Sequence, residues 1–176
     1  QFVGGGGMGA VFRAWDTDLY RTVAVKVLSA YQVGDVESQR RFQTEARSAA
    51  RLDHPNIARL YDVGTDAQGR PYMALEYVEG DPIDAHCRRH ALSIAERLVL
   101  LLQAADAVAF AHSRLVIHRD LKPANILVTA EGQVRLLDFG IAKLMEGDSA
   151  QETALTRASG RALTRDYASP EQIRGE

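Results

Sequence analysis

The sequence predicts an α+β fold in two parts, with strands concentrated in residues 1–78 and helices in residues 79–176. Up to residue 78, short runs of β-branched and aromatic residues alternate with polar and glycine turns, and only one segment has a helical period. After Gly80, apolar residues recur at helical spacing over a long segment. A chain of 176 residues, 46% of them hydrophobic, is long enough to bury a core of its own.

Two strands are predicted near the start of the first part. Residues 11–15 and 22–28 are rich in β-branched and aromatic types, and the polar residues at 16–18 favour a turn between them. This pattern indicates two strands that pair as a hairpin.

A helix over residues 38–52 follows, because its apolar residues recur at helical spacing until His54-Pro55 ends the pattern. The recurring residues are Phe42, Ala46, Ala49 and Leu52. Two further strands are predicted over 58–63 and 71–78, separated by a turn that glycines bound at 64 and 69.

The second part is expected to be anchored by one long helix. Ser93 is a suitable N-cap, and Glu96 stands three residues later, as in a capping box. Residues 125–128 and 134–137 predict a small hairpin, and residues 145–168 predict a long loop without a period. One face of the long helix carries Ile94, Leu98, Leu101, Leu102, Ala105, Val108 and Ala109.

Charge and cysteine content exclude several classes of protein. The formal net charge of -2 offers no general attraction for nucleic acid or anionic lipid, so any phosphate must be bound locally. The single cysteine, Cys87, excludes an internal disulfide and favours a reducing compartment. No apolar run approaches the length that spans a bilayer.

A glycine-rich run occupies residues 3–11 and fits the pattern G-x-G-x-x-G-x-V, with Gly4, Gly6, Gly9 and Val11 in register. Without side chains, such glycines let backbone N–H groups approach phosphate oxygens closely. A flexible linker has a similar composition. In a dinucleotide-binding fingerprint the glycines open a helix, whereas here a strand is expected to follow.

Lys26 is placed on an otherwise apolar strand. Period two puts Lys26 on the same face as Ala24, so its ammonium group projects from a half-buried surface and needs a partner. Glu45 lies on the apolar stripe of the predicted 38–52 helix, and the two groups satisfy each other if they pair. The alternatives are a Lys26 that reaches solvent along its stem and a solvated Glu45.

Two more motifs stand in the second part. Residues 117–125 fit H-R-D-L-x-x-x-N, and residues 138–140 are Asp-Phe-Gly. With the glycine run, Lys26 and Glu45 these motifs occur once each and in order, so essentially the whole chain resembles a bacterial eukaryotic-type (Hanks-type) serine/threonine protein kinase domain. The resemblance implies a two-lobed kinase fold, with 1–78 as the N-lobe and 79–176 as an incomplete C-lobe, truncated at both ends.

The resemblance implies ATP and Mg2+ as cofactors and assigns the reacting groups. Asp120 is expected to orient the substrate hydroxyl and accept its proton, while Lys122 neutralises the γ-phosphate. Asn125 and Asp138 are expected to hold Mg2+ through oxygen ligands, which suit a hard cation. The implied reaction is transfer of the γ-phosphate to serine or threonine of proteins.

The same resemblance implies a nucleotide site between the lobes. Lys26, held by Glu45, would bind the α- and β-phosphates. The apolar walls and backbone polar groups that a planar base requires are also present by position, although each apolar residue taken singly is equally consistent with core packing. They are Val3, Val11 and Ala24 as the roof, Leu127 as the floor, Leu75 before the hinge, and the backbone of Glu76 and Val78 at the adenine edge.

The loop after residue 140 is expected to carry regulation. Arg119 beside Asp120 is placed to receive a phosphate from that loop, with Thr156 as the first choice and Thr153 and Ser159 as the others. Two departures from the family pattern are Leu163, where glycine is usual, and Ser169-Pro170-Glu171, where the first residue is usually alanine. Leu163 leaves the peptide preference open.

Several expectations concern the whole protein. The partners implied are ATP, protein substrates with serine or threonine acceptors, and a second copy for autophosphorylation in trans, with no nucleic acid and a cytoplasmic location. The alternative function is a catalytically silent nucleotide-binding module, a pseudokinase or scaffold, because a fold does not prove activity. The fragment alone is expected to be unstable and poorly active, with apolar surface and the Glu171 charge uncovered.

Overall fold

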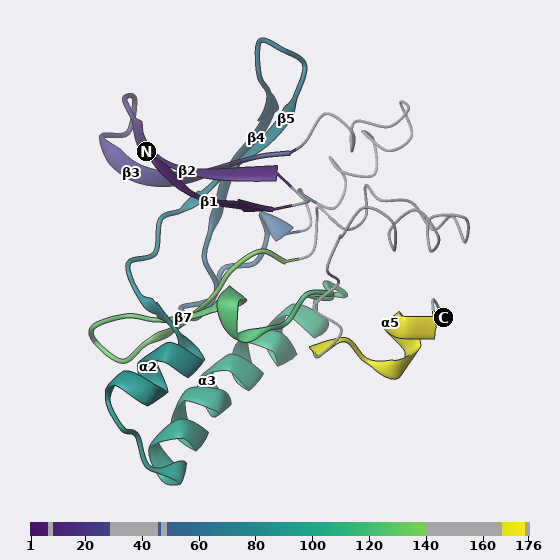
Figure 1. Ribbon diagram of the computed structural model, residues 1–176. Helices are drawn as coiled ribbons and strands as arrows, with labels where there is room; N and C mark the ends of the chain where they lie inside the picture. The colour runs from purple at the N-terminus through teal and green to yellow at the C-terminus, as the bar shows by residue number, and fades with distance from the viewer. Residues whose placement is uncertain (7–8, 29–45, 47–48, 140–166, 175–176) are drawn as a thin grey trace.

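The computed structural model describes residues 1–6, 9–28, 46, 49–139 and 167–174. A five-stranded sheet forms one layer, and a second group of helices with a small three-stranded sheet lies below it (Figure 1). The α+β class is therefore confirmed. Within these described ranges, none of the helices is long and apolar enough to cross a membrane.

The five-stranded sheet is antiparallel, in the order β1-β2-β3-β5-β4. Its strands are β1 (Phe2–Gly6), β2 (Gly9–Asp16), β3 (Arg21–Val27), β4 (Leu60–Thr65) and β5 (Pro71–Glu76). Asp16 closes the β2–β3 turn, because its Oδ1 accepts the N–H groups of Asp18 and Leu19 at 3.2 and 3.1 Å. The Leu19 N–H is the main cause of the lowered pKa of Asp16.

The second group begins with a segment that the sequence analysis did not predict. After the two-residue strand β6 (Asp81–Pro82), helix α2 (Ile83–Arg89) buries Ile83 and Cys87 on one side. Its exposed side carries an i,i+4 ion pair between Arg88 and Asp84 at 2.9 Å. The apolar pair and the charged pair, each four residues apart, are both visible in the sequence. A segment of seven residues is nevertheless too short for such a spacing to predict a helix.

The remaining elements of the second group follow the predicted order. Helix α3 (Ile94–His112) begins at Ser93, and the capping box with Glu96 is present. The 3-10 turn η2 (Pro123–Asn125) leads into β7 (Ile126–Val128), which pairs with β6 and with β8 (Val134–Leu136). Helix α5 (Pro170–Arg174) is the last element.

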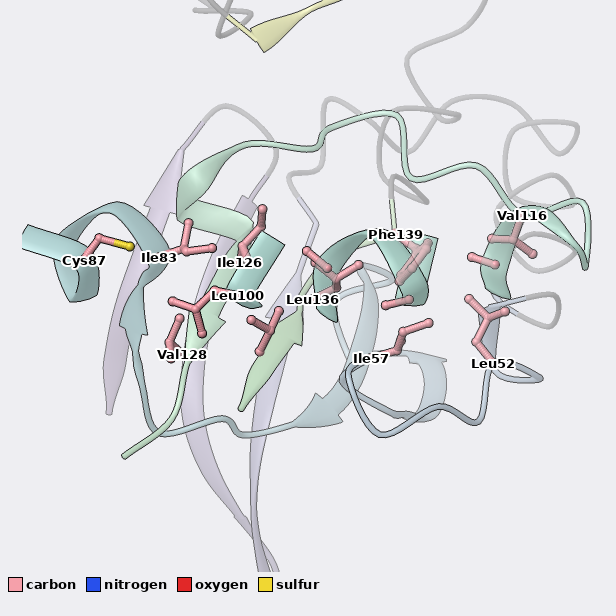
Figure 2. Packing of buried hydrophobic residues seen from close by; sticks show 14 residues of the cluster. Leu52, Ile57, Ile83, Cys87, Leu100, Val116, Ile126, Val128, Leu136 and Phe139 are labelled. Atoms are coloured by element: carbon pink, nitrogen blue, oxygen red, sulfur yellow. The ribbon is translucent and has the colours of Figure 1, made fainter. Parts of the chain in front are cut away.

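The main hydrophobic core lies between α2, α3 and the β7–β8 hairpin (Figure 2). It also takes in the segment before β4 and the Asp-Phe-Gly motif, through Leu52, Ile57 and Phe139. Ile57 forms a bridge with Leu136, whose N–H donates to Asn56 O at 2.8 Å and whose carbonyl accepts Ala58 N–H at 2.9 Å. These contacts attach the segment that precedes β4 to strand β8.

The apolar stripe expected on the long helix lies mostly on its exposed side. Ile94, Leu98 and Leu102 are 79%, 53% and 68% exposed, and only Val108 of that stripe packs against the core. The helix is apolar on more than one side, so its period could not select the buried face. The buried stripe consists of Leu100, Ala104, Ala107 and Ala111.

We expect the exposed stripe to make the isolated 176-residue chain associate with itself. Replacing Leu98 and Leu102 together with glutamine should reduce the association measured by sedimentation velocity, because exposed apolar area drives it. The control is Leu100→Gln, which buries an amide in the core and should lower the free energy of unfolding by about 2–4 kcal/mol. Unchanged association of the Leu98/Leu102 variant would contradict this prediction.

Candidate active site

Asp120, Lys122 and Asn125 are brought together by the loop that follows α3. The Nζ atom of Lys122 lies 2.8 Å from Asp120 Oδ2. Asn125 is buried, and its Nδ2 donates to the same Asp120 Oδ2 at 3.0 Å and to the Asp120 carbonyl at 2.8 Å. These bonds orient a carboxylate that is 16% exposed and still reachable from solvent.

This loop is bonded to the segment that carries Asp138. Leu137 donates its N–H to the Asn125 carbonyl at 2.9 Å, and its own carbonyl accepts a hydrogen bond from His118 Nε2 at 2.8 Å. The ring of His118 also packs on Phe139, with 4.7 Å between ring centroids. The bonds hold the two predicted motifs in register, although they lie on separate parts of the chain.

Within the described residues, each of the two motifs contains one residue with a positive φ angle, and three residues elsewhere, Tyr20, Ala91 and Leu115, also have one. Arg119 and Asp138 have φ angles of 61° and 53°, which are unfavourable for residues with a Cβ atom. Such conformations persist only where surrounding contacts impose them, and they are most frequent at functional sites.

Lys26 is buried, as the strand pattern predicts, and its partner among the described residues is Asp138. The Nζ atom lies 2.6 Å from Asp138 Oδ2. Glu45, the partner proposed from the sequence, lies outside the described residues. The ion pair spans the two groups of elements, because Lys26 is on β3 and Asp138 follows β8.

The glycine motif turns between β1 and β2, where Gly4 pairs with Val11 and Gly6 with Gly9. Gly9 has a φ of 130°, and a Cβ there would lie 2.1 Å from the Val27 carbonyl oxygen. Only glycine fits this position. A Cβ at Gly4 would meet none of the described atoms within 4 Å, so the described residues leave that side of the strand uncovered.

The residues proposed for the adenine pocket are spread over both sheets. Ala24 pairs with Leu75, and Val11 pairs with Lys26, so three strands of the large sheet contribute neighbouring positions. Leu127 is half-buried between the buried Ile126 and Val128, so it points away from the core. Val78 is half-buried after the end of β5, whereas Val3 is 54% exposed.

Glu76 makes side-chain contacts that the sequence analysis missed. Its carboxylate receives a hydrogen bond from Arg135 of β8, and its Oε2 also accepts the Arg59 N–H at 3.2 Å. Arg135 alternates with the buried Val134 and Leu136 and therefore lies on the opposite face of β8, where a charge usually meets solvent, so the sequence carried no clear signal of this pair.

The oxygen donors fit a hard divalent cation. Asn125 uses Nδ2 for both of its bonds to Asp120, which leaves the amide oxygen Oδ1 as its ligand atom. Asp138 adds a carboxylate that is 31% exposed. An amide oxygen and a carboxylate are the donor types that Mg2+ takes from proteins.

Burial lowers the pKa of His118, although the bond to the Leu137 carbonyl opposes this shift. Nε2 must carry the proton to donate to that carbonyl, and Nδ1 has no hydrogen-bond partner among the described residues. The ring is therefore neutral in the folded protein near pH 7, which fits a packing residue.

The lowered pKa of His118 predicts acid destabilisation. Below about pH 6.5 the unfolded chain takes up a proton that the folded ring resists, so the free energy of unfolding should fall with pH until the folded-state pKa is reached. His118→Phe keeps a ring against Phe139 and should flatten this dependence in urea titrations between pH 7.5 and 5.5. His112→Gln, at an exposed histidine, should keep the wild-type slope, and an equal slope in the His118 variant would refute the assignment.

A depression beside the loop that follows α3 is lined by Pro82, Asp84, Ala85, Arg88, Lys122, Pro123, Ala124 and Tyr167. Beyond it, Glu171 is exposed at the start of α5, and its pKa is lowered by its own backbone N–H and by the Ser169 side chain. Ser169, which stands where the family pattern usually has alanine, therefore stabilises the ionised form of Glu171. Thr153, Thr156, Ser159 and Leu163 lie outside the described residues.

Comparison with known proteins gives consistent matches. The protein kinase domain family model matches residues 1–176. A probable serine/threonine-protein kinase of Streptomyces coelicolor is 41% identical over 178 residues, covering 99% of this chain and 26% of the relative. Serine/threonine-protein kinase PknA of Mycobacterium tuberculosis is 39% identical over 180 residues, covering 99% of this chain and 41% of the relative.

Solved structures agree with the sequence matches. A Mycobacterium tuberculosis PknI kinase domain superposes with a TM-score of 0.69 at 35% identity, covering 80% of this chain and 57% of that chain. The chain thus spans less than half the length of these two curated relatives and a little over half of the solved kinase domain.

Proposed function

This chain belongs to the protein kinase family, and on that premise we propose that it transfers the γ-phosphate of ATP to serine or threonine side chains of proteins. The observation that carries the proposal is the cluster of Asp120, Lys122 and Asn125, bonded through Leu137 to the segment that presents Asp138 to Lys26. These residues supply a carboxylate for the acceptor hydroxyl, two cations for the phosphates and two oxygen ligands for Mg2+, which are side chains that phosphoryl transfer uses.

The geometry supports a role for each of these residues. Asp120 orients the acceptor hydroxyl and takes its proton, since its carboxylate is held by two neighbours and remains reachable. Lys122 is proposed to neutralise the phosphoryl group that approaches Asp120, which its contact with the same carboxylate oxygen supports. Serine and threonine are the proposed acceptors because the named relatives are serine/threonine-protein kinases.

Nucleotide binding is proposed to use both sheets. Lys26 binds the α- and β-phosphates, the glycine turn around Gly4 and Gly6 covers them with backbone N–H groups, and Gly9 permits the turn itself. The adenine lies against the apolar residues of the two sheets, with its edge at the backbone of Glu76 and Val78. Glu45 is proposed to hold Lys26 when the nucleotide separates Lys26 from Asp138.

Mg2+ is proposed to be held by Asn125 and Asp138, which supply an amide oxygen and a carboxylate. When bound, the cation neutralises charge on the phosphate oxygens. The chain's own contribution is to fix both ligands, through the bonds of Asn125 to Asp120 and of Leu137 to Asn125.

Regulation and substrate contacts are proposed for two further regions. Phosphorylation of Thr156, Thr153 or Ser159 by a second copy of the protein would supply an anion for Arg119. The depression that Lys122 shares with α2 is proposed to receive residues flanking the acceptor, because Lys122 also contacts the Asp120 carboxylate.

The test is transfer of labelled γ-phosphate from ATP to the protein itself and to a basic protein acceptor, followed by phosphoamino acid analysis. We expect Mg2+-dependent phosphoserine or phosphothreonine. Nucleotide binding with no transfer under any of these conditions would favour the alternative of a silent nucleotide-binding module.

A further inference from the structure

We propose that Arg135 is a positioning residue for ATP, because its ion pair with Glu76 links the adenine-binding end of β5 to the strand that leads to Asp138. This inference rests on the proposed function. It assigns a role to two side chains, whereas the proposed function uses only the backbone of Glu76.

Glu76 is held at its backbone and at its side chain. Its N–H donates to the Arg59 carbonyl at 2.8 Å, and its Oε2 accepts the Arg59 N–H at 3.2 Å and a hydrogen bond from Arg135 Nη2. The Glu76 side chain is 26% exposed. The last residue of β5 is thus attached to the segment before β4 and to β8 at the same time.

Arg135 reaches Glu76 from the opposite side of the site. It lies between Val134 and Leu136, which are fully buried, and its side chain is 17% exposed. Its Nη2 also donates to the Ile57 carbonyl at 3.3 Å, and its buried Nε has no partner within the described ranges. The Glu76 carboxylate is the only acid paired with Arg135 in the described part of the chain, so it controls how the guanidinium is placed.

The pair connects the end of β5 at Glu76 with the segment after β8 that carries Asp138, and in the proposed function both of these segments contact the same nucleotide. Asp138 follows Arg135 by three residues, and Leu136 between them is bonded to Asn56 and Ala58. ATP would touch the backbone at Glu76 with its adenine and Asp138 with its metal-bound phosphates. A change in the separation of the two segments therefore weakens binding of the whole nucleotide more than binding of adenosine, which contacts only one of them.

The experiment compares Arg135→Met, Glu76→Gln and the double variant in the full-length protein. Calorimetry gives the Kd for adenosine and for ATP with and without Mg2+. We expect each single variant to weaken Mg·ATP binding by about tenfold, adenosine binding by less than about threefold, and the double variant to be no worse than the singles. The factor by which Mg2+ strengthens ATP binding should fall, which a loss of stability alone would not cause.

Two further variants make the result specific. Arg135→Lys keeps a cation facing Glu76 and should recover part of the Mg·ATP affinity. Arg59→Met removes a neighbouring arginine side chain whose ion pair with Asp53 is exposed, and it should bind all three ligands like the wild type.

Equal losses for adenosine and Mg·ATP, additive effects in the double variant, or wild-type affinities in both single variants would each overturn the inference. The outcome is separable from the proposed function. A wild type that binds nucleotide with the expected coupling but transfers no phosphate would remove the proposed function and support the link.

Discussion

Replacing Asp120 with asparagine is expected to lower kcat for phosphate transfer by about 10²- to 10⁴-fold, the contribution typical of a positioned proton acceptor. Asparagine has the same shape, and its amide oxygen can still accept the bonds from Lys122 and Asn125. Because Asp120 has no proposed contact with the adenine or the metal, the Kd for Mg·ATP should change by less than about threefold. The measurement is single-turnover transfer beside calorimetric binding.

The matched control is Asp62→Asn, at an exposed aspartate on β4, which should retain wild-type kcat. An Asp120→Asn protein that transfers phosphate at the wild-type rate would remove Asp120 from the proposed chemistry. If both variants transferred phosphate slowly, the loss of kcat would not be specific to Asp120, and the assignment of Asp120 would fail as well.

Lys26→Met is expected to give the second large loss, about 10²- to 10³-fold in kcat/KM for ATP. The side chain is 10% exposed and lies on an apolar strand, so methionine fills the same space without strain. The cation for the phosphates is lost, and Asp138 loses the group that holds its Oδ2. Steady-state kinetics at varied ATP, with a thermal melt of each protein, separate this effect from unfolding.

Lys26→Arg serves as the charge-conserving comparison. A planar guanidinium cannot reproduce the point contact of Nζ with Asp138, so we expect activity between those of the wild type and the methionine variant. Wild-type kcat/KM in Lys26→Met would show that the phosphates are neutralised by another group.

Local chemistry made much of this fold predictable from the sequence. The β2–β3 turn follows from Asp16, whose carboxylate binds the next N–H groups, and the start of α3 follows from the Ser93 and Glu96 capping box. The β7–β8 hairpin follows from two short apolar runs joined by a glycine turn. Each of these signals acts between residues close in the sequence.

Other features depended on contacts between distant segments. The buried face of α3 is the alanine-rich stripe around Ala104 and Ala107, because small side chains let the helix pack against β8, whereas the larger residues at Leu98 and Leu102 stay exposed. Hydrophobicity alone predicted that the face with the larger apolar residues would be the buried face of α3. Helix α2 was missed because its short apolar pattern becomes decisive only when Ile83 and Cys87 meet the core.

The sequence by itself determined the α+β class, the strand that carries Lys26 and the motifs around Asp120 and Asp138, because residue type and spacing specify local backbone and chemistry. Only the tertiary structure decided that Lys26 meets Asp138 and that Arg135 meets Glu76. Those partners are separated by 112 and 59 residues, and no local periodicity encodes which charged residues pair over such a distance in the sequence. Their pairing is a result of packing, which brings together groups that could not be buried alone.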